Sequence, residues 1–160
     1  MRILAIDPGY ERVGIAILGK DTLVFSECFK TSSKIPFSER LFLIGREIES
    51  VIKKYKPKLL AIEKLFFATN QKTAMSVSEA KGVIVYEAKK AGLKIFEYTP
   101  LEIKIAVTGY GKSDKKSVID MVKKLIKINE NKNSDDEIDA IAVGLACFAR
   151  EKFRNLRVIL

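Results

Sequence analysis

Histidine is absent from this 160-residue sequence. The chain therefore lacks the commonest general base, and it cannot form a zinc site built on histidine. The same absence excludes catalytic mechanisms of the Ser-His-Asp and Cys-His types. Any enzymatic chemistry must depend on other side chains or on a bound cofactor.

Cysteine is scarce, and long apolar runs are missing. Cys28 and Cys147 lie far apart without the spacing of metal ligands, which fits a reducing, cytoplasmic location. No stretch of 18 or more apolar residues occurs, and Met1-Arg2 leads directly into a short apolar run. We therefore expect neither a membrane span nor a signal peptide.

Length and composition predict one globular domain, which we place at residues 1–150, with residues 151–160 as a C-terminal tail. The net charge of +9 favours a polyanionic partner, with nucleic acid as the first candidate. Thermophile proteins rich in lysine and glutamate have a similar composition, so clustering of the positive charge must decide between these readings.

The first 18 residues contain two apolar runs joined by Asp7-Pro8-Gly9. Proline and glycine after a run rich in isoleucine and leucine end a strand at once. This pattern places the Asp7 carboxylate at the rim of a sheet. Taken alone, Asp7 is an ordinary turn residue, and a catalytic role requires other carboxylates nearby.

The remaining pattern predicts an α/β fold with a mixed five-stranded sheet flanked by helices. Three antiparallel strands are followed by two parallel strands, and amphipathic helices lie between and after them. The expected strands are Arg2–Asp7, Glu11–Leu18, Thr22–Phe29, Leu59–Glu63 and Leu93–Tyr98.

Two further parts of the chain place carboxylates where they can meet Asp7. Glu63 ends a strand that a helical crossover makes parallel to the first, so both carboxylates emerge at the same sheet edge. Asp136 and Asp139 are three residues apart at the start of the last helix, with Ser134 and Glu137 as its capping box. Acidic residues are favoured in the first turn of a helix by the helix dipole, which is enough to explain Asp136. The dipole explains Asp139 less well, because Asp139 lies deeper in the helix.

Four grouped carboxylates favour a site for a hard divalent cation. Such a group repels itself unless metal neutralises it, and oxygen ligands suit Mg²⁺, with Mn²⁺ as a substitute. Two such ions about 3.5–4 Å apart hydrolyse phosphodiesters without needing a histidine. The sequence therefore predicts a two-metal nuclease site at Asp7, Glu63, Asp136 and Asp139.

Aromatic and basic residues gather near these carboxylates. Phe66 and Phe67 follow the strand that ends at Glu63; such residues are more often core than ligand contacts, but a loop position favours a partner. Seven lysines lie between Lys112 and Lys132, after a loop with two glycines and a tyrosine. Most lysine runs are solvated helix faces, although this one also suits a backbone lying against phosphates.

Five sequence blocks in this order and spacing resemble the RuvC family of Holliday junction resolvases, which has the ribonuclease H-like nuclease fold. They cover about residues 1–150. The blocks are IDPGYERVG (Ile6–Gly14), AIEKLFFATN (Ala61–Asn70), EAKGV (Glu79–Val83), Pro100 through KIAVTGYG (Lys104–Gly111) to KKSV (Lys115–Val118), and DEIDAIAVG (Asp136–Gly144).

The resemblance implies a homodimeric, divalent-metal-dependent endonuclease that places symmetric nicks in a four-way DNA junction. It implies RuvA and RuvB, a branch-migration motor, as partners. The four carboxylates match the family's metal-binding catalytic residues. Phe66 matches an aromatic that enters among the bases, and Lys104 and Lys116 match lysines near the DNA backbone. The full set of expected DNA contacts is Phe66, Phe67, Asn70, Lys81, Lys104, Lys112, Lys115 and Lys116.

The sequence departs from the family pattern at Thr69, Ser78 and Glu79, which puts local DNA contacts there in doubt. Three other functions fit parts of the sequence. One is a ribonuclease H-like nuclease acting on structured RNA. Another is an actin-like or sugar-kinase-like ATPase, which needs two such domains. The third is a noncatalytic nucleic-acid-binding module, for which the grouped carboxylates would be a liability.

Overall fold

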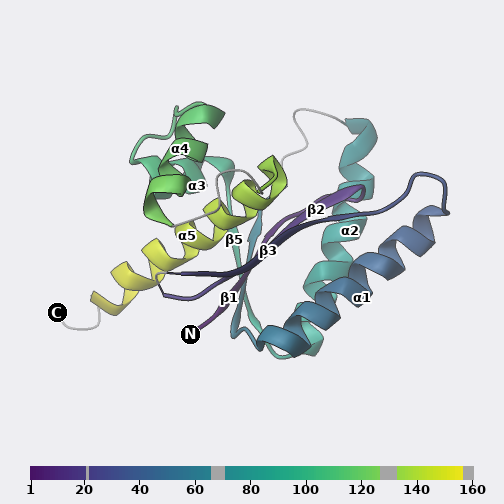
Figure 1. Ribbon diagram of the computed structural model, residues 1–160. Coiled ribbons are helices and arrows are strands. Elements are labelled where there is room, and N and C mark those ends of the chain that lie inside the picture. The colour runs from purple at the N-terminus through teal and green to yellow at the C-terminus, as the bar shows by residue number, and fades with distance from the viewer. Residues whose placement is uncertain (21, 66–70, 127–132, 157–160) are drawn as a thin grey trace.

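The computed structural model describes residues 1–20, 22–65, 71–126 and 133–156 of the chain (Figure 1). The strands are β1 (Ile3–Asp7), β2 (Arg12–Leu18), β3 (Leu23–Lys30), β4 (Leu59–Glu63) and β5 (Lys94–Tyr98). The helices are α1 (Phe37–Tyr55), α2 (Gln71–Lys90), α3 (Pro100–Thr108), α4 (Lys115–Leu125) and α5 (Asp135–Leu156). As predicted, β1 ends at Asp7 and β4 ends at Glu63.

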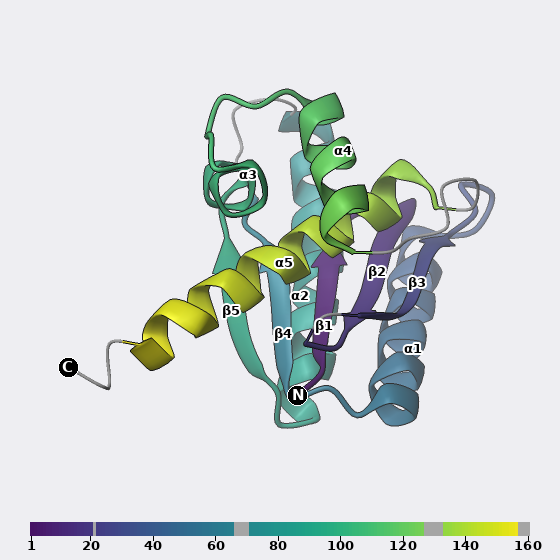
Figure 2. The same ribbon diagram turned by 60° about the vertical axis from the view of Figure 1, so that its left-hand side comes forward.

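The strands form one sheet in the order β3-β2-β1-β4-β5. The β1–β2 and β2–β3 pairs are antiparallel, whereas β1–β4 and β4–β5 are parallel. This confirms the predicted mixed sheet. β1 and β4 lie next to each other at its centre, with Ile6 opposite Ile62, so both strands point the same way (Figure 2).

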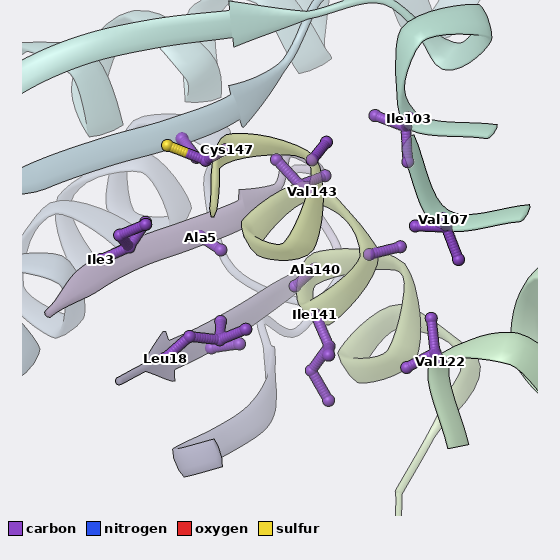
Figure 3. Close-up of a cluster of buried hydrophobic side chains, with 14 of the residues drawn as sticks. Ile3, Ala5, Leu18, Ile103, Val107, Val122, Ala140, Ile141, Val143 and Cys147 are labelled. Atoms are coloured by element: carbon purple, nitrogen blue, oxygen red, sulfur yellow. The ribbon is translucent and has the colours of Figure 1, made fainter. Parts of the chain in front are cut away.

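Helices cover both faces of the sheet and give the molecule three layers (Figures 1 and 2). α1 and α2 pack on one face through Ile44, Ile48 and Ile84, which are fully buried. The other face carries α5, with α3 and α4 packed against it. Figure 3 shows this second core, where Ala140 and Val143 of α5 lie over the strands.

Small residues let α5 lie very close to the sheet. A Cβ added at Gly144 would come within 2.6 Å of a Leu18 methyl carbon and 3.1 Å of the Ala5 Cβ. Ala140, one turn earlier on α5, is also fully buried. The close approach sets the depth at which the first turns of α5 meet the ends of β1 and β4.

The backbone of α5 continues to Leu156, past the boundary at residue 150 that the sequence suggested. The division into a domain at residues 1–150 and a tail at residues 151–160 remains a prediction. No helix within the described ranges is long and apolar enough to cross a membrane.

Candidate active site

The two strand-end carboxylates lie side by side because β1 and β4 are parallel neighbours in register. Ile6 pairs with Ile62, which places Asp7 and Glu63 as the next residues at the same edge. Both side chains are partly buried there, at the carboxyl ends of their strands. Sites in sheets of this kind form at this edge. The prediction that Asp7 and Glu63 lie at the same edge of the sheet is therefore confirmed.

Gly14 brings the start of α5 to the same edge. It pairs with Asp7 across β1 and β2. A Cβ at this position would lie 2.0 Å from the backbone carbonyl oxygen of Asp136, so only glycine fits without a shift of the backbone. The last residue of the IDPGYERVG block thus positions Asp136 beside Asp7.

A buried polar network fixes the same turn of α5. The Ser134 backbone N–H donates to the Glu137 carboxylate (3.1 Å), and the Glu137 N–H donates to Ser134 Oγ (3.4 Å), which confirms the predicted capping box. Ser26 Oγ of β3 and Asn133 Nδ2 also donate to Glu137, at 2.6 and 2.8 Å. These bonds tie the helix start to the sheet and hold the pKa of Glu137 below its ordinary value, against its burial.

The electrostatics show that the four predicted carboxylates share one environment. Burial is the main cause that raises the pKa of Asp7 from 3.8 to about 8, and the negative charges of its acidic neighbours raise it further. Those neighbours, in decreasing order of effect, are Glu63, Asp139 and Asp136. Burial also raises the pKa of Glu63, and the negative charge of Asp139 raises it further. The site therefore has a deficit of positive charge.

Two cationic side chains partly offset this deficit. Lys115 Nζ donates to Asp139 Oδ2 at 3.2 Å and lies 3.4 Å from Asp135 Oδ2. Burial raises the pKa of Asp139, and the ammonium of Lys115 acts in the opposite direction. Arg12 Nε donates to Asp136 Oδ2 at 2.9 Å, and its Nη2 bonds to the same oxygen.

The donor chemistry of the site fits a hard divalent cation. Its ligands would be carboxylate oxygens, which suit Mg²⁺ and Mn²⁺. A cation would relieve the repulsion that raises the pKa of Asp7. With their present rotamers, however, the described Asp, Glu and Cys side chains do not form a group of three that could hold an ion. Asp136 and Asp139 instead face Arg12 and Lys115.

A pocket of about 220 Å³ opens beside these carboxylates. Its lining includes two acidic residues, Glu63 and Asp139, and two basic ones, Lys104 of α3 and Lys115 of α4. Apolar side chains of α3, α4 and α5, including Ile103, form the rest. A pocket with both charges can hold a phosphate next to carboxylate oxygens.

The predicted DNA contacts are distributed unevenly around the site. Lys112 and Lys116 are exposed on the loop and helix that follow α3. Lys81 turns toward β5, where its Nζ lies 3.2 Å from Glu97 Oε2 and the side chain is only 13% exposed. Ser78 and Glu79 are exposed on α2. Four residues of interest, Phe66, Phe67, Thr69 and Asn70, lie outside the described residues.

Sequence reasoning missed Arg12 and Ser26 as parts of this site. Arg12 is an ordinary exposed residue at the start of a hairpin strand until tertiary structure brings Asp136, 124 positions away, to its guanidinium. Ser26 bonds to Glu137 across 111 positions. The capping box marked Glu137 as structured, but no local pattern indicated its partner on β3.

A sheet of this order, with helices on both faces and carboxylates at the ends of its central strands, has the ribonuclease H-like fold. Within this class, the family model for "Crossover junction endodeoxyribonuclease RuvC" matches residues 3–147, and the chain belongs to the RuvC family. Both predictions, of fold and of family, are confirmed. The family is divalent-metal-dependent.

Curated relatives and solved structures agree with this assignment. The crossover junction endodeoxyribonuclease RuvC of Finegoldia magna is 42% identical over 160 residues, covering 98% of each protein. That of Halothermothrix orenii is 42% identical over 149 residues, covering 91% of this chain and 90% of the relative. Thermus thermophilus RuvC in complex with Holliday junction substrate matches with a TM-score of 0.88 and 28% identity, covering 95% of this chain and 96% of that chain.

Proposed function

We propose that this protein is a divalent-metal-dependent endonuclease that resolves four-way DNA junctions. One observation carries the proposal: a RuvC-family chain brings Asp7 into electrostatic contact with three further carboxylates at one sheet edge. The match to a RuvC structure solved with its Holliday junction supports the junction as the substrate.

The proposed metal ligands are the oxygens of Asp7, Glu63, Asp136 and Asp139. Two ions per site would share them, with Mg²⁺ as the natural metal and Mn²⁺ as a substitute. When bound, divalent ions at such a site activate water for attack on phosphorus and stabilise the leaving oxygen.

The chain's own residues prepare this chemistry. The Asp7 carboxyl, with its pKa near 8, must lose its proton to act as a ligand. Glu63 is held beside it by the register of β1 and β4. Lys115 and Lys104 line the same pocket as Glu63 and Asp139, where their ammonium groups can hold a phosphate oxygen.

Two of the proposed DNA contacts, Lys104 and Lys115, line this pocket. Exposed Lys112 and Lys116 are suited to backbone phosphates, and Lys104 and Lys115 to the phosphate being cut. Phe66 is proposed to enter among the bases at the junction centre, and Phe67 and Asn70 are proposed as further DNA contacts. Lys81 is proposed as a DNA contact because it lies in the EAKGV block (Glu79–Val83) that resembles the family. Its pairing with Glu97 suits it to ordering that part of the site.

The proposed assembly is a homodimer whose two sites cut two strands of like polarity. It would work with RuvA and RuvB, the branch-migration proteins of the family. We place it in the cytoplasm, which the low cysteine content and the wide sequence separation of Cys28 and Cys147 support.

The test is a nicking assay on a synthetic four-way junction, with a linear duplex of the same sequence and a structured precursor RNA as comparison substrates. We expect paired nicks in the junction with Mg²⁺, and binding without cleavage with Ca²⁺. Asp139→Asn should bind the junction but leave it intact.

Equal cutting of junction and linear duplex would reduce the function to a general nuclease. Preferred cutting of the RNA would favour the RNA-processing alternative. Junction binding without cleavage under any divalent metal would favour a noncatalytic module.

A further inference from the structure

We infer that Arg12 competes with divalent metal for Asp136, so that its guanidinium occupies Oδ2 of this carboxylate until metal displaces it. The inference rests on the proposed metal-dependent function and assigns a role to a residue outside the carboxylate set. Arg12 is thus a positioning residue that sets how readily the site takes up metal.

The hydrogen bonds on one oxygen carry the inference. Arg12 Nε donates to Asp136 Oδ2 at 2.9 Å, and Arg12 Nη2 bonds to the same atom. The Cys28 thiol also donates to Oδ2, at 3.4 Å. A carboxylate oxygen offers two lone pairs. With three donors directed at it, Oδ2 has no lone pair left for a cation.

The other three carboxylates of the site differ from Asp136 in this respect. Burial and mutual repulsion raise the pKa values of Asp7 and Glu63, so a cation there would relieve an existing penalty. Asp139 shares its Lys115 partner with Asp135. Asp136 receives a guanidinium fork at two points, and metal must break this pairing before it can use Oδ2.

The exchange needs only side-chain rotation. The Arg12 side chain is 50% exposed at the first residue of β2, so its guanidinium can turn into solvent without disturbing the core. The backbone of Asp136 cannot follow, because its carbonyl oxygen is packed against Gly14. Asp136 therefore stays beside Asp7 while its carboxylate changes partner.

The expected effect is moderate because a half-exposed ion pair is weak. Replacing Arg12 with glutamine removes the competing charge and keeps a polar side chain of similar length. We expect Arg12→Gln to tighten Mn²⁺ binding about twofold to fivefold. Without metal, the same variant should unfold at a lower temperature, since Asp136 then adds an unpaired charge to the acidic group.

The test measures Mn²⁺ binding to the full chain by isothermal titration calorimetry and electron paramagnetic resonance, without DNA. Circular dichroism first shows that each variant is folded. The matched control is Arg46→Gln, which removes an exposed arginine on α1 that lies over the Phe42 ring. We expect the control to leave both Mn²⁺ affinity and unfolding temperature unchanged.

A double-mutant cycle separates competition at Asp136 from a general charge effect. In an Asp136→Asn background, Arg12→Gln should no longer tighten Mn²⁺ binding. Equal tightening in both backgrounds would overturn the inference, as would unchanged or weaker Mn²⁺ binding by folded Arg12→Gln. If the unmodified protein bound no Mn²⁺, the proposed metal-dependent function itself would fail, which is a distinct result.

Discussion

The Gly14 α-carbon faces the backbone carbonyl oxygen of Asp136 so closely that a Cβ on Gly14 would lie 2.0 Å from that oxygen. The contact joins the second strand to the first turn of the last helix, at the residue paired with Asp7. The position of a proposed catalytic carboxylate thus depends on a residue with no side chain.

The first prediction concerns this contact. Gly14→Ala must push the start of α5 away from β2, which we expect to cost about 1–3 kcal/mol of unfolding free energy. Junction nicking should fall at least about tenfold, because small misplacements of catalytic groups are costly. The control is Gly82→Ala in the middle of α2, where an added Cβ meets nothing within 4 Å. It should keep or slightly raise the stability, measured by chemical denaturation.

The second prediction uses the raised pKa of Asp7. Between pH 3.8 and about 8 the folded metal-free state holds a proton on Asp7 that the unfolded state releases. The contribution of this carboxyl to stability is therefore fully present below pH 3.8 and is lost as the pH rises through about 8.

Asp7→Asn should remove this pH dependence. In EDTA at pH 9 we expect the variant to unfold about 3–6 °C above the unmodified protein, and the difference should shrink toward pH 5. Differential scanning calorimetry measures both. Asp120→Asn, an exposed change on α4, serves as the control. A difference that is independent of pH would contradict the assignment of the titration to Asp7.

The third prediction concerns Lys115, whose ammonium lies between Asp135 and Asp139. Lys115→Gln should lower the free energy of unfolding in EDTA by about 1 kcal/mol or less. The loss should become smaller in Mg²⁺, because the metal restores the missing positive charge. Thermal unfolding of the variant with and without Mg²⁺ measures the effect. An equal loss under both conditions would mean that Lys115 does not share its carboxylate with metal.

The fourth prediction tests a proposed phosphate contact. Lys116→Ala should weaken junction binding and reduce the slope of log affinity against log salt by about 0.9, the value expected for one lost phosphate. Fluorescence anisotropy in Ca²⁺ measures binding without cleavage. Lys94→Ala is the matched control, since Lys94 is exposed at the opposite edge of the sheet, where β5 begins. A slope unchanged by Lys116→Ala would place this lysine away from the DNA.

Much of the fold was predictable because its signals are local. Pro8 and Gly9 end the first strand at Asp7, and a carboxylate ends the apolar run at Glu63. The rule for crossover connections then makes their strands parallel. The capping box at Ser134 set the start of α5 and therefore the helical position of Asp139.

The partners of these carboxylates could not be predicted in the same way. Lys115 belongs to a lysine-rich segment that indicated DNA binding, and only the packing of α4 against α5 brings its ammonium to Asp139. Arg12 meets Asp136 for a similar reason, through the approach of α5 to Gly14. Contacts of this kind depend on distances between elements, which periodicity and capping do not determine.

The site is assembled from two strands within the first 63 residues and from a helix whose Asp139 comes 132 positions after Asp7. During synthesis on the ribosome, β1 and β4 emerge long before α5, and α5 supplies two of the four proposed ligands. A nascent or prematurely terminated chain would therefore carry no complete nuclease site. The cell would be exposed to strand-cutting activity only from chains that had been translated through α5.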